Sequence, residues 1–101
     1  MGLFDSKKSE EKVARITDFF SAEDLSKIKG LIEPGKAERK YKLQYMDIVD
    51  CLLTAVNNPE KILNKKEVTS ILYSVGAMTK IEPSLNSILS PAIIKMRAFR
   101  K

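Results

Sequence analysis

Three stretches of the sequence carry the same signal for the start of a helix. In FFSAEDL and LNKKEV, a side chain that can cap free amides is followed three residues later by an acid: Ser21 with Asp24, and Asn64 with Glu67. In LSPAII, a serine can cap a helix whose first position is taken by Pro91, where a missing amide costs nothing. These signals predict a chain built mainly of helices.

Apolar residues between these signals repeat at helical spacing. Residues 13–20, 25–32 and 65–79 each carry one narrow apolar stripe, so each is expected to be a helix that faces the core on one side. The segment from about 37 to 57 is apolar over more than half of its circumference, as is typical of a helix that others surround. No stretch shows the alternation or the hairpin turns typical of strands.

Prolines divide these segments and complete the fold prediction. Pro34 and Pro83 are expected to interrupt helices, because a proline disfavours helical geometry at the residue before it. We therefore predict an all-α fold, a single compact bundle of five or six short helices around a central apolar helix at about 37–57. The bundle forms one domain over residues 1–101, and residues 1–8 are expected to be either flexible or packed against it.

The composition fits one small folded domain without metals or disulfides. With 101 residues, of which 44% are hydrophobic and 31% charged, the chain can bury one modest core. Its single cysteine, Cys51, can form no internal disulfide, and its place in the most apolar segment predicts an inert core thiol. Since the chain has no histidine, the usual thiolate and imidazole metal sets cannot be assembled, and we expect no metal and no cofactor. With no long apolar run and no secretory signal, a cytoplasmic protein is predicted.

The sequence also lacks the common sets of catalytic residues. Ser-His-Asp and Cys-His catalysis need a histidine, and the glycines form no loop of the kind that cradles phosphates. Asp47 and Asp50 share a helical face, but nothing supplies the second half of a metal or acid-base site, so we expect a solvated polar strip. We predict no catalytic residues and a non-enzymatic interaction or regulatory module. A protein partner or self-association is the leading expectation.

Positive charge is concentrated in the later part of the chain. Residues 41–101 carry nine basic and five acidic side chains and so supply four units of the formal net charge of +5. The last seven residues, KMRAFRK, contain four cations and no acid, which favours anionic partners. Tyr73 points away from the apolar stripe of its segment, and exposed tyrosines are enriched at interfaces. The candidate partner-binding residues are therefore Tyr41, Tyr73, Lys95, Arg97, Arg100 and Lys101.

Two other functions stay open as alternatives. The first is nucleic-acid binding through the basic C-terminal helix. The sequence is only a weak match to a helix-turn-helix motif with its turn at Gly76, because Glu82 and Pro83 do not fit the second half of that motif. The second is peripheral membrane association, since MGLFDSKK fits an acylation pattern with Gly2 as acceptor and Ser6 at the required spacing. The charges near Gly2 are balanced, and a single acyl chain binds membranes only marginally without a second signal.

Overall fold

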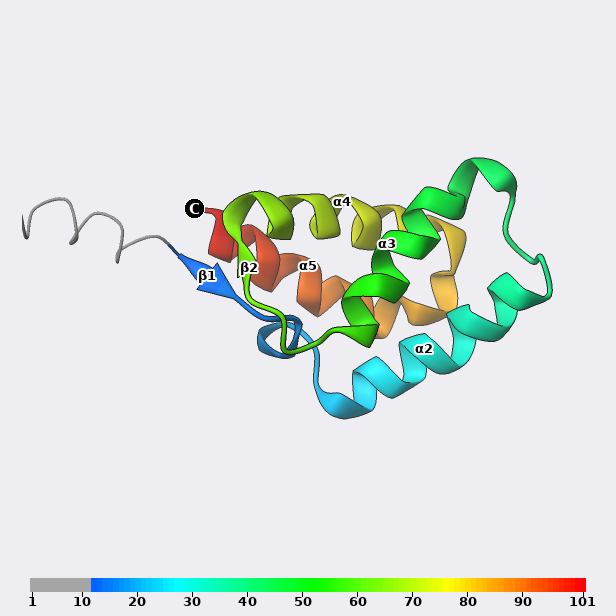
Figure 1. Ribbon diagram of the computed structural model, residues 1–101, viewed down its shortest axis with the longest axis horizontal. Helices are drawn as coiled ribbons and strands as arrows, with labels where there is room; N and C mark the ends of the chain where they lie inside the picture. The colour runs from blue at the N-terminus through cyan, green and yellow to red at the C-terminus, as the bar shows by residue number, and fades with distance from the viewer. Residues whose placement is uncertain (1–11) are drawn as a thin grey trace, which may run out of the picture.

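The computed structural model describes residues 12–101, which form four α-helices and one short pair of strands (Figure 1). The helices are α2 (Ala22–Ala37), α3 (Met46–Asn57), α4 (Lys65–Ile81) and α5 (Asn86–Arg100). Strands β1 (Val13–Ala14) and β2 (Leu63–Asn64) pair antiparallel, with Val13 opposite Asn64 and Ala14 opposite Leu63. Short 3₁₀ turns lie at Ile16–Asp18, Leu43–Tyr45 and Pro83–Leu85.

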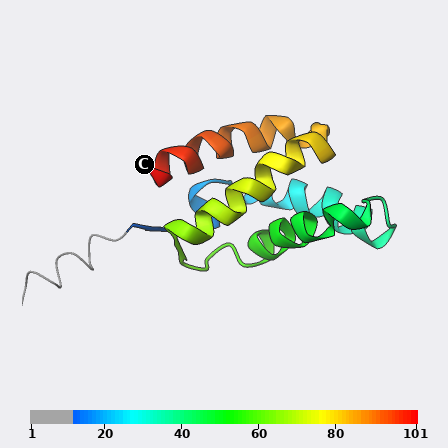
Figure 2. The ribbon, with the colours of Figure 1, turned by 90° about the horizontal axis from the view of Figure 1, so that it is seen from above.

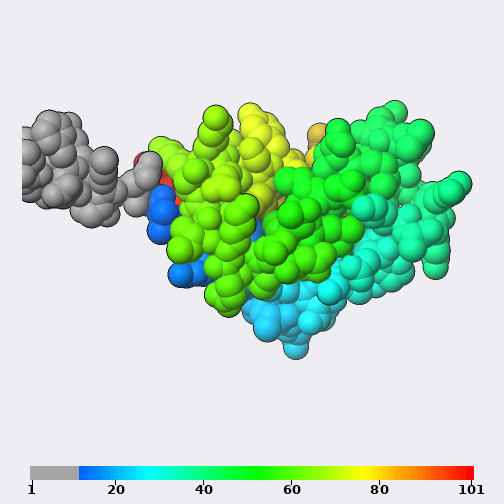
Figure 3. All heavy atoms as spheres, in the orientation of Figure 1, coloured from blue at the N-terminus to red at the C-terminus, as the bar shows by residue number. Residues whose placement is uncertain are grey.

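The helices pack in the order of the sequence, with α4 at the centre. Helix α2 packs on α3, α3 on α4, and α4 on α5. Figure 2 shows α5 on one side of α4 and the pair α2 and α3 on the other. In Figure 3 the side chains of α3 fill the space between α2 and α4. Since α4 contacts both neighbouring helices and both strands, the central position predicted for the segment at about 37–57 belongs to α4 instead.

The capping signals before α2 and α4 are confirmed. The Ser21 hydroxyl accepts a hydrogen bond of 3.1 Å from the Asp24 amide, and the Asp24 carboxylate accepts one of 3.4 Å from the Ser21 amide. At α4, Asn64 Oδ1 accepts from the Glu67 amide at 2.8 Å, and Glu67 Oε1 accepts from the Asn64 amide at 3.0 Å. Both helices therefore begin at the residues that the sequence indicated.

Two prolines lie inside helices rather than at their boundaries. Helix α2 continues through Pro34 to Ala37, and α5 begins at Asn86, five residues before Pro91. Each proline removes one backbone hydrogen bond from its helix, but both are exposed, so water can satisfy the carbonyl that is left without a donor. The predictions of an interruption at Pro34 and of a helix start at Pro91 are wrong for this reason.

The described residues form four helices rather than five or six, because the segment at 13–20 is not a helix, and the predicted helix at about 37–57 is shorter than expected. The segment at about 37–57 is helical only from Met46, after a left-handed residue, Arg39 with φ of 58°, turns the chain at the end of α2. The Lys40 amide donates a hydrogen bond of 2.8 Å to the Gly35 carbonyl, which closes this turn.

The predicted helix at 13–20 is instead a strand followed by a 3₁₀ turn. Val13 pairs with Asn64 in the two-stranded sheet, which the sequence did not indicate. A strand of two residues is too short to show an alternating pattern. Ile16 and Phe20 are nevertheless buried, because the turn directs both side chains into the core.

The core combines the stripes of all four helices with the residues before α2. Its largest fully buried side chains are Ile16, Ile28, Ile32, Leu52, Met78, Leu89 and Met96. Cys51 is half-buried at the edge of this core and carries a free thiol, so it is less enclosed than predicted. None of the helices within residues 12–101 combines the length and the apolar character needed to cross a bilayer.

Candidate functional site

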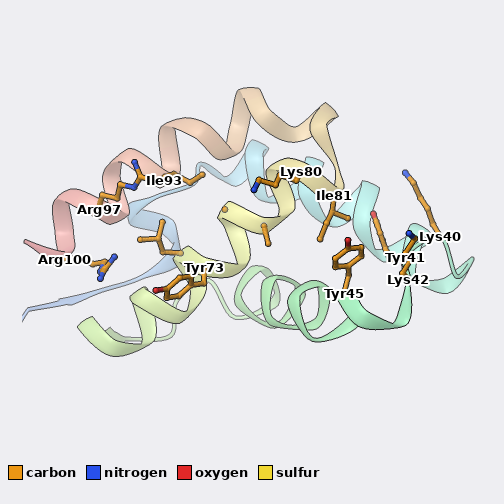
Figure 4. A pocket seen from close by; sticks show the side chains of 13 residues that line it. Lys40, Tyr41, Lys42, Tyr45, Tyr73, Lys80, Ile81, Ile93, Arg97 and Arg100 are labelled. Carbon is orange, nitrogen blue, oxygen red and sulfur yellow. The ribbon is translucent and has the colours of Figure 1, made fainter.

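A groove of about 750 Å³ runs along the outer side of α4 (Figure 4). We call it the α4 groove. Its walls come from α4, from α5 and from the chain between α2 and α3. Figure 4 shows Ile93, Arg97 and Arg100 toward one end and Lys40, Tyr41, Lys42 and Tyr45 toward the other, with Tyr73 and Lys80 between them. The remaining lining residues are Leu72, Gly76, Ala77 and Ile81.

The rim of the α4 groove is strongly cationic. Five of its thirteen lining residues are lysine or arginine, and none is acidic. Lys40 forms an ion pair with the buried carboxylate of Glu82, which does not line the groove. No ion pair joins Lys42, Lys80, Arg97 or Arg100 to an acidic side chain of residues 12–101. These four charges therefore favour an anionic occupant.

The floor of the α4 groove is apolar and open at its middle. Leu72, Ala77 and Ile81 flank the buried stripe of α4 and are only partly covered by the neighbouring helices. A Cβ atom added at Gly76 would find nothing within 4 Å, so the absence of a side chain there leaves space in the groove. Ile93 of α5 extends the apolar surface on the opposite wall. The groove can thus hold an apolar body beneath charged contacts.

The two candidate tyrosines have different environments. Tyr73 is 76% exposed, so the prediction that it points away from the core is confirmed. Tyr41, the other candidate, is only 8% exposed and so does not belong to the free surface. Its ring fits against Gly35, where an added Cβ would come within 2.9 Å of the ring atoms, and its hydroxyl is held by Glu82. Tyr41 therefore shapes one end of the groove rather than projecting from it.

Glu82 is a buried carboxylate held by three donors. Its Oε2 accepts hydrogen bonds from Lys40 Nζ at 2.6 Å and from the Tyr41 hydroxyl at 2.9 Å, and its Oε1 accepts from the Ser84 hydroxyl at 3.3 Å. Burial alone would raise the pKa of Glu82, but the bonds from Lys40 and Tyr41 outweigh it and hold the pKa below its usual range. Burial, followed by the bond to the Glu82 carboxylate, raises the pKa of Tyr41 above its usual range.

The remaining candidate residues lie in three places. Arg97 and Arg100 line the α4 groove. Together with Lys101, they also line a second hollow at the start of α4. We call this second surface, lined by Asn64, Lys65, Lys66, Thr69, Arg97, Arg100 and Lys101, the basic hollow. Lys95 is exposed on α5 but lines neither surface. Gly2 and Ser6 lie outside the described residues.

The predicted polar strip of α3 is partly engaged in an ion pair. Asp47 is exposed, whereas the half-buried Asp50 pairs with Lys36 of α2. Within residues 12–101, no three histidine, cysteine, aspartate or glutamate side chains gather closely enough to hold a metal ion. Gly76 lies within the continuous helix α4, so the turn that a helix-turn-helix would need there is not formed.

Sequence reasoning missed several residues of the α4 groove. Lys42 and Tyr45 reach it only because the chain after α2 folds back toward the end of α4. Lys80 could have been found, since Tyr73, Ala77 and Lys80 are spaced to share one face of a helix. Comparison of the chain with family models, with curated proteins and with solved structures finds no match.

Proposed function

We propose that this protein is a non-enzymatic interaction module whose α4 groove binds an acidic, amphipathic helical segment of another protein. The observation that carries this proposal is the combination of five cations, no acid and an apolar floor among the thirteen lining residues. An amphipathic helix can place its apolar side chains on such a floor and its carboxylates against the rim. The single cysteine, which is free, agrees with a cytoplasmic location, where thiols stay reduced.

A protein segment uses more of this surface than the alternative partners do. Nucleic acid would be attracted to the cations, but it carries no aliphatic side chains for Leu72, Ile81 and Ile93. A second copy of the chain would bring a formal net charge of +5 toward a cationic groove, which opposes self-association through this surface. Tyr73, exposed on the wall, provides the aromatic contact that is typical of protein interfaces.

Site-specific photo-crosslinking in extract of the native host tests this proposal. A photoreactive phenylalanine analogue at Tyr73 should capture a distinct protein, whereas the same analogue at Thr54, exposed on α3, should not. The captured protein should contain an acidic amphipathic segment, and its capture should be lost when Lys80 and Arg97 are changed to glutamate. Cross-links to nucleic acid alone, to a second copy of this chain, or equally from both positions would contradict the proposal.

A further inference from the structure

The basic hollow is a second cationic surface, and its lining differs from that of the α4 groove. Five of its seven lining residues are lysine or arginine, and the other two are Asn64 and Thr69. No acidic, aromatic or aliphatic residue lines it. Within residues 12–101, none of the five cations forms an ion pair with an acidic side chain. Within the described residues, the charge gathered there is therefore not neutralised by direct ion pairs.

The positions of two of these lysines have no explanation in the stability of the fold. Arg97 and Arg100 lie in the last turn of α5, where cations interact favourably with the helix dipole. Lys65 and Lys66 occupy the first two positions of α4, where the same dipole disfavours positive charge. The capping residues already bond the amides of Asn64 and Glu67 at this helix end, and the lysine side chains add positive charge beside them. Two lysines where the helix dipole disfavours positive charge, beside two further arginines, indicate a surface for an anion.

We propose that the basic hollow binds the phosphate backbone of a nucleic acid, without regard to base sequence. Exposed lysines and arginines contact phosphates, and a lining without aromatic residues provides no surface on which bases could stack. The cations come from the start of α4 and the end of α5. Because Arg97 and Arg100 also line the α4 groove, the positive surface is elongated and fits a linear anion better than a compact one. Substitutions at Lys65, Lys66 and Lys101 can test the basic hollow alone, because these residues do not line the α4 groove.

Binding of a fluorescein-labelled 20-base-pair duplex DNA of arbitrary sequence, followed by anisotropy from 50 to 200 mM salt, tests the proposal. With up to five phosphate contacts, the slope of log K against log salt should reach about −4.5, a loss of several hundred-fold in affinity over this range. The variant K65A/K66A/K101A should weaken binding at 50 mM salt and make the slope shallower by about 2.7, since three contacts are removed. A duplex of different sequence should bind equally well.

The matched control removes the same charge from another face. K27A/K29A/R39A also lowers the formal net charge from +5 to 5 − 3 = +2, but its residues line neither surface, so it should retain most of the binding. Equal losses in the two variants would show attraction by net charge alone and overturn the assignment. It would also be overturned by no binding at 50 mM salt, or by retention on phosphatidylserine vesicles without binding to DNA.

Discussion

The Tyr41 hydroxyl donates a hydrogen bond of 2.9 Å to Oε2 of Glu82, and this bond joins the chain after α2 to the end of α4. The two residues lie 41 positions apart in the sequence, and both are buried. Lys40 and Ser84 contribute further donors to the same carboxylate. This cluster fixes one end of the α4 groove, so its loss should affect both stability and the shape of the groove.

Replacing Tyr41 with phenylalanine tests how strongly the cluster holds the fold. The variant leaves a buried carboxylate with one donor fewer, which should lower the free energy of unfolding by about 1.5–3 kcal/mol. Urea denaturation followed by circular dichroism measures this change. Tyr73→Phe is the control, because the Tyr73 side chain is exposed and its change should alter stability very little. Equal effects of the two variants would contradict the role given to Tyr41.

Alanine at two glycines of α2 should have opposite effects. At Gly30 an added Cβ meets nothing within 4 Å, so Gly30→Ala should stabilise the protein by about 0.5–1 kcal/mol through helix propensity. At Gly35 the added Cβ would come within 2.9 Å of Tyr41, so Gly35→Ala should displace the ring and cost about 1–3 kcal/mol. Thermal unfolding of both variants measures the difference, and a stabilising Gly35→Ala would show that Tyr41 moves aside without cost.

Stability should fall at both extremes of pH through the same cluster. The pKa of Glu82 lies below its ordinary value of 4.5, so its contribution is present above that pH and is lost as the pH falls through the pKa in the folded state. The pKa of Tyr41 lies above its ordinary value of 10.0, so stability should decline as the pH rises beyond about 10. Urea midpoints between pH 3 and 11 measure both changes.

Glu82→Gln isolates the acidic part of this pH dependence. The wild-type protein should be more stable than the variant at pH 7, and their difference should shrink below pH 4.5 as Glu82 becomes protonated. A difference that stays constant from pH 7 to pH 3 would mean that the charge of Glu82 contributes nothing to the cluster.

Filling the α4 groove at its open centre should block the proposed partner without unfolding the protein. Gly76→Glu places a side chain and a negative charge where a Cβ meets nothing within 4 Å, so the fold should be retained while capture from Tyr73 is lost. Gly30→Glu makes the same change of charge in the open space beside α2 and should leave capture intact. Circular dichroism verifies folding of both variants, and undiminished capture by Gly76→Glu would place the partner outside the groove.

The sequence predicted the features that are set locally. Ser21 and Asn64 mark the starts of α2 and α4, because a capping residue and its acid are three positions apart and need no other part of the chain. The same reasoning misjudged Pro34 and Pro91, because the cost of a proline inside a helix depends on whether water reaches the carbonyl it leaves free, and the sequence does not show that exposure. Starts marked by a capping residue and its acid were therefore predicted correctly, as was the interruption at Pro83, whereas the two prolines that lie inside helices were not.

The candidate site was predicted only in part, for a similar reason. Tyr73, Arg97 and Arg100 were identified from exposure on a helix and from local charge, and all three line the α4 groove. The burial of Tyr41, a candidate partner-binding residue, was not predicted, because its partner Glu82 lies 41 residues away and no local pattern connects them. Lys42, Tyr45 and Lys80 belong to the groove through tertiary packing, which brings the chain after α2 to the end of α4.

Arg97 and Arg100 line both the α4 groove and the basic hollow. Two ligands that rely on the same pair of guanidinium groups cannot each have the full benefit of them at once. If both proposed ligands bind, each should therefore weaken the binding of the other, and thermodynamic reciprocity makes the factor the same in both directions. We therefore expect the two proposed partners to compete, so that the concentration of one affects the occupancy of the other.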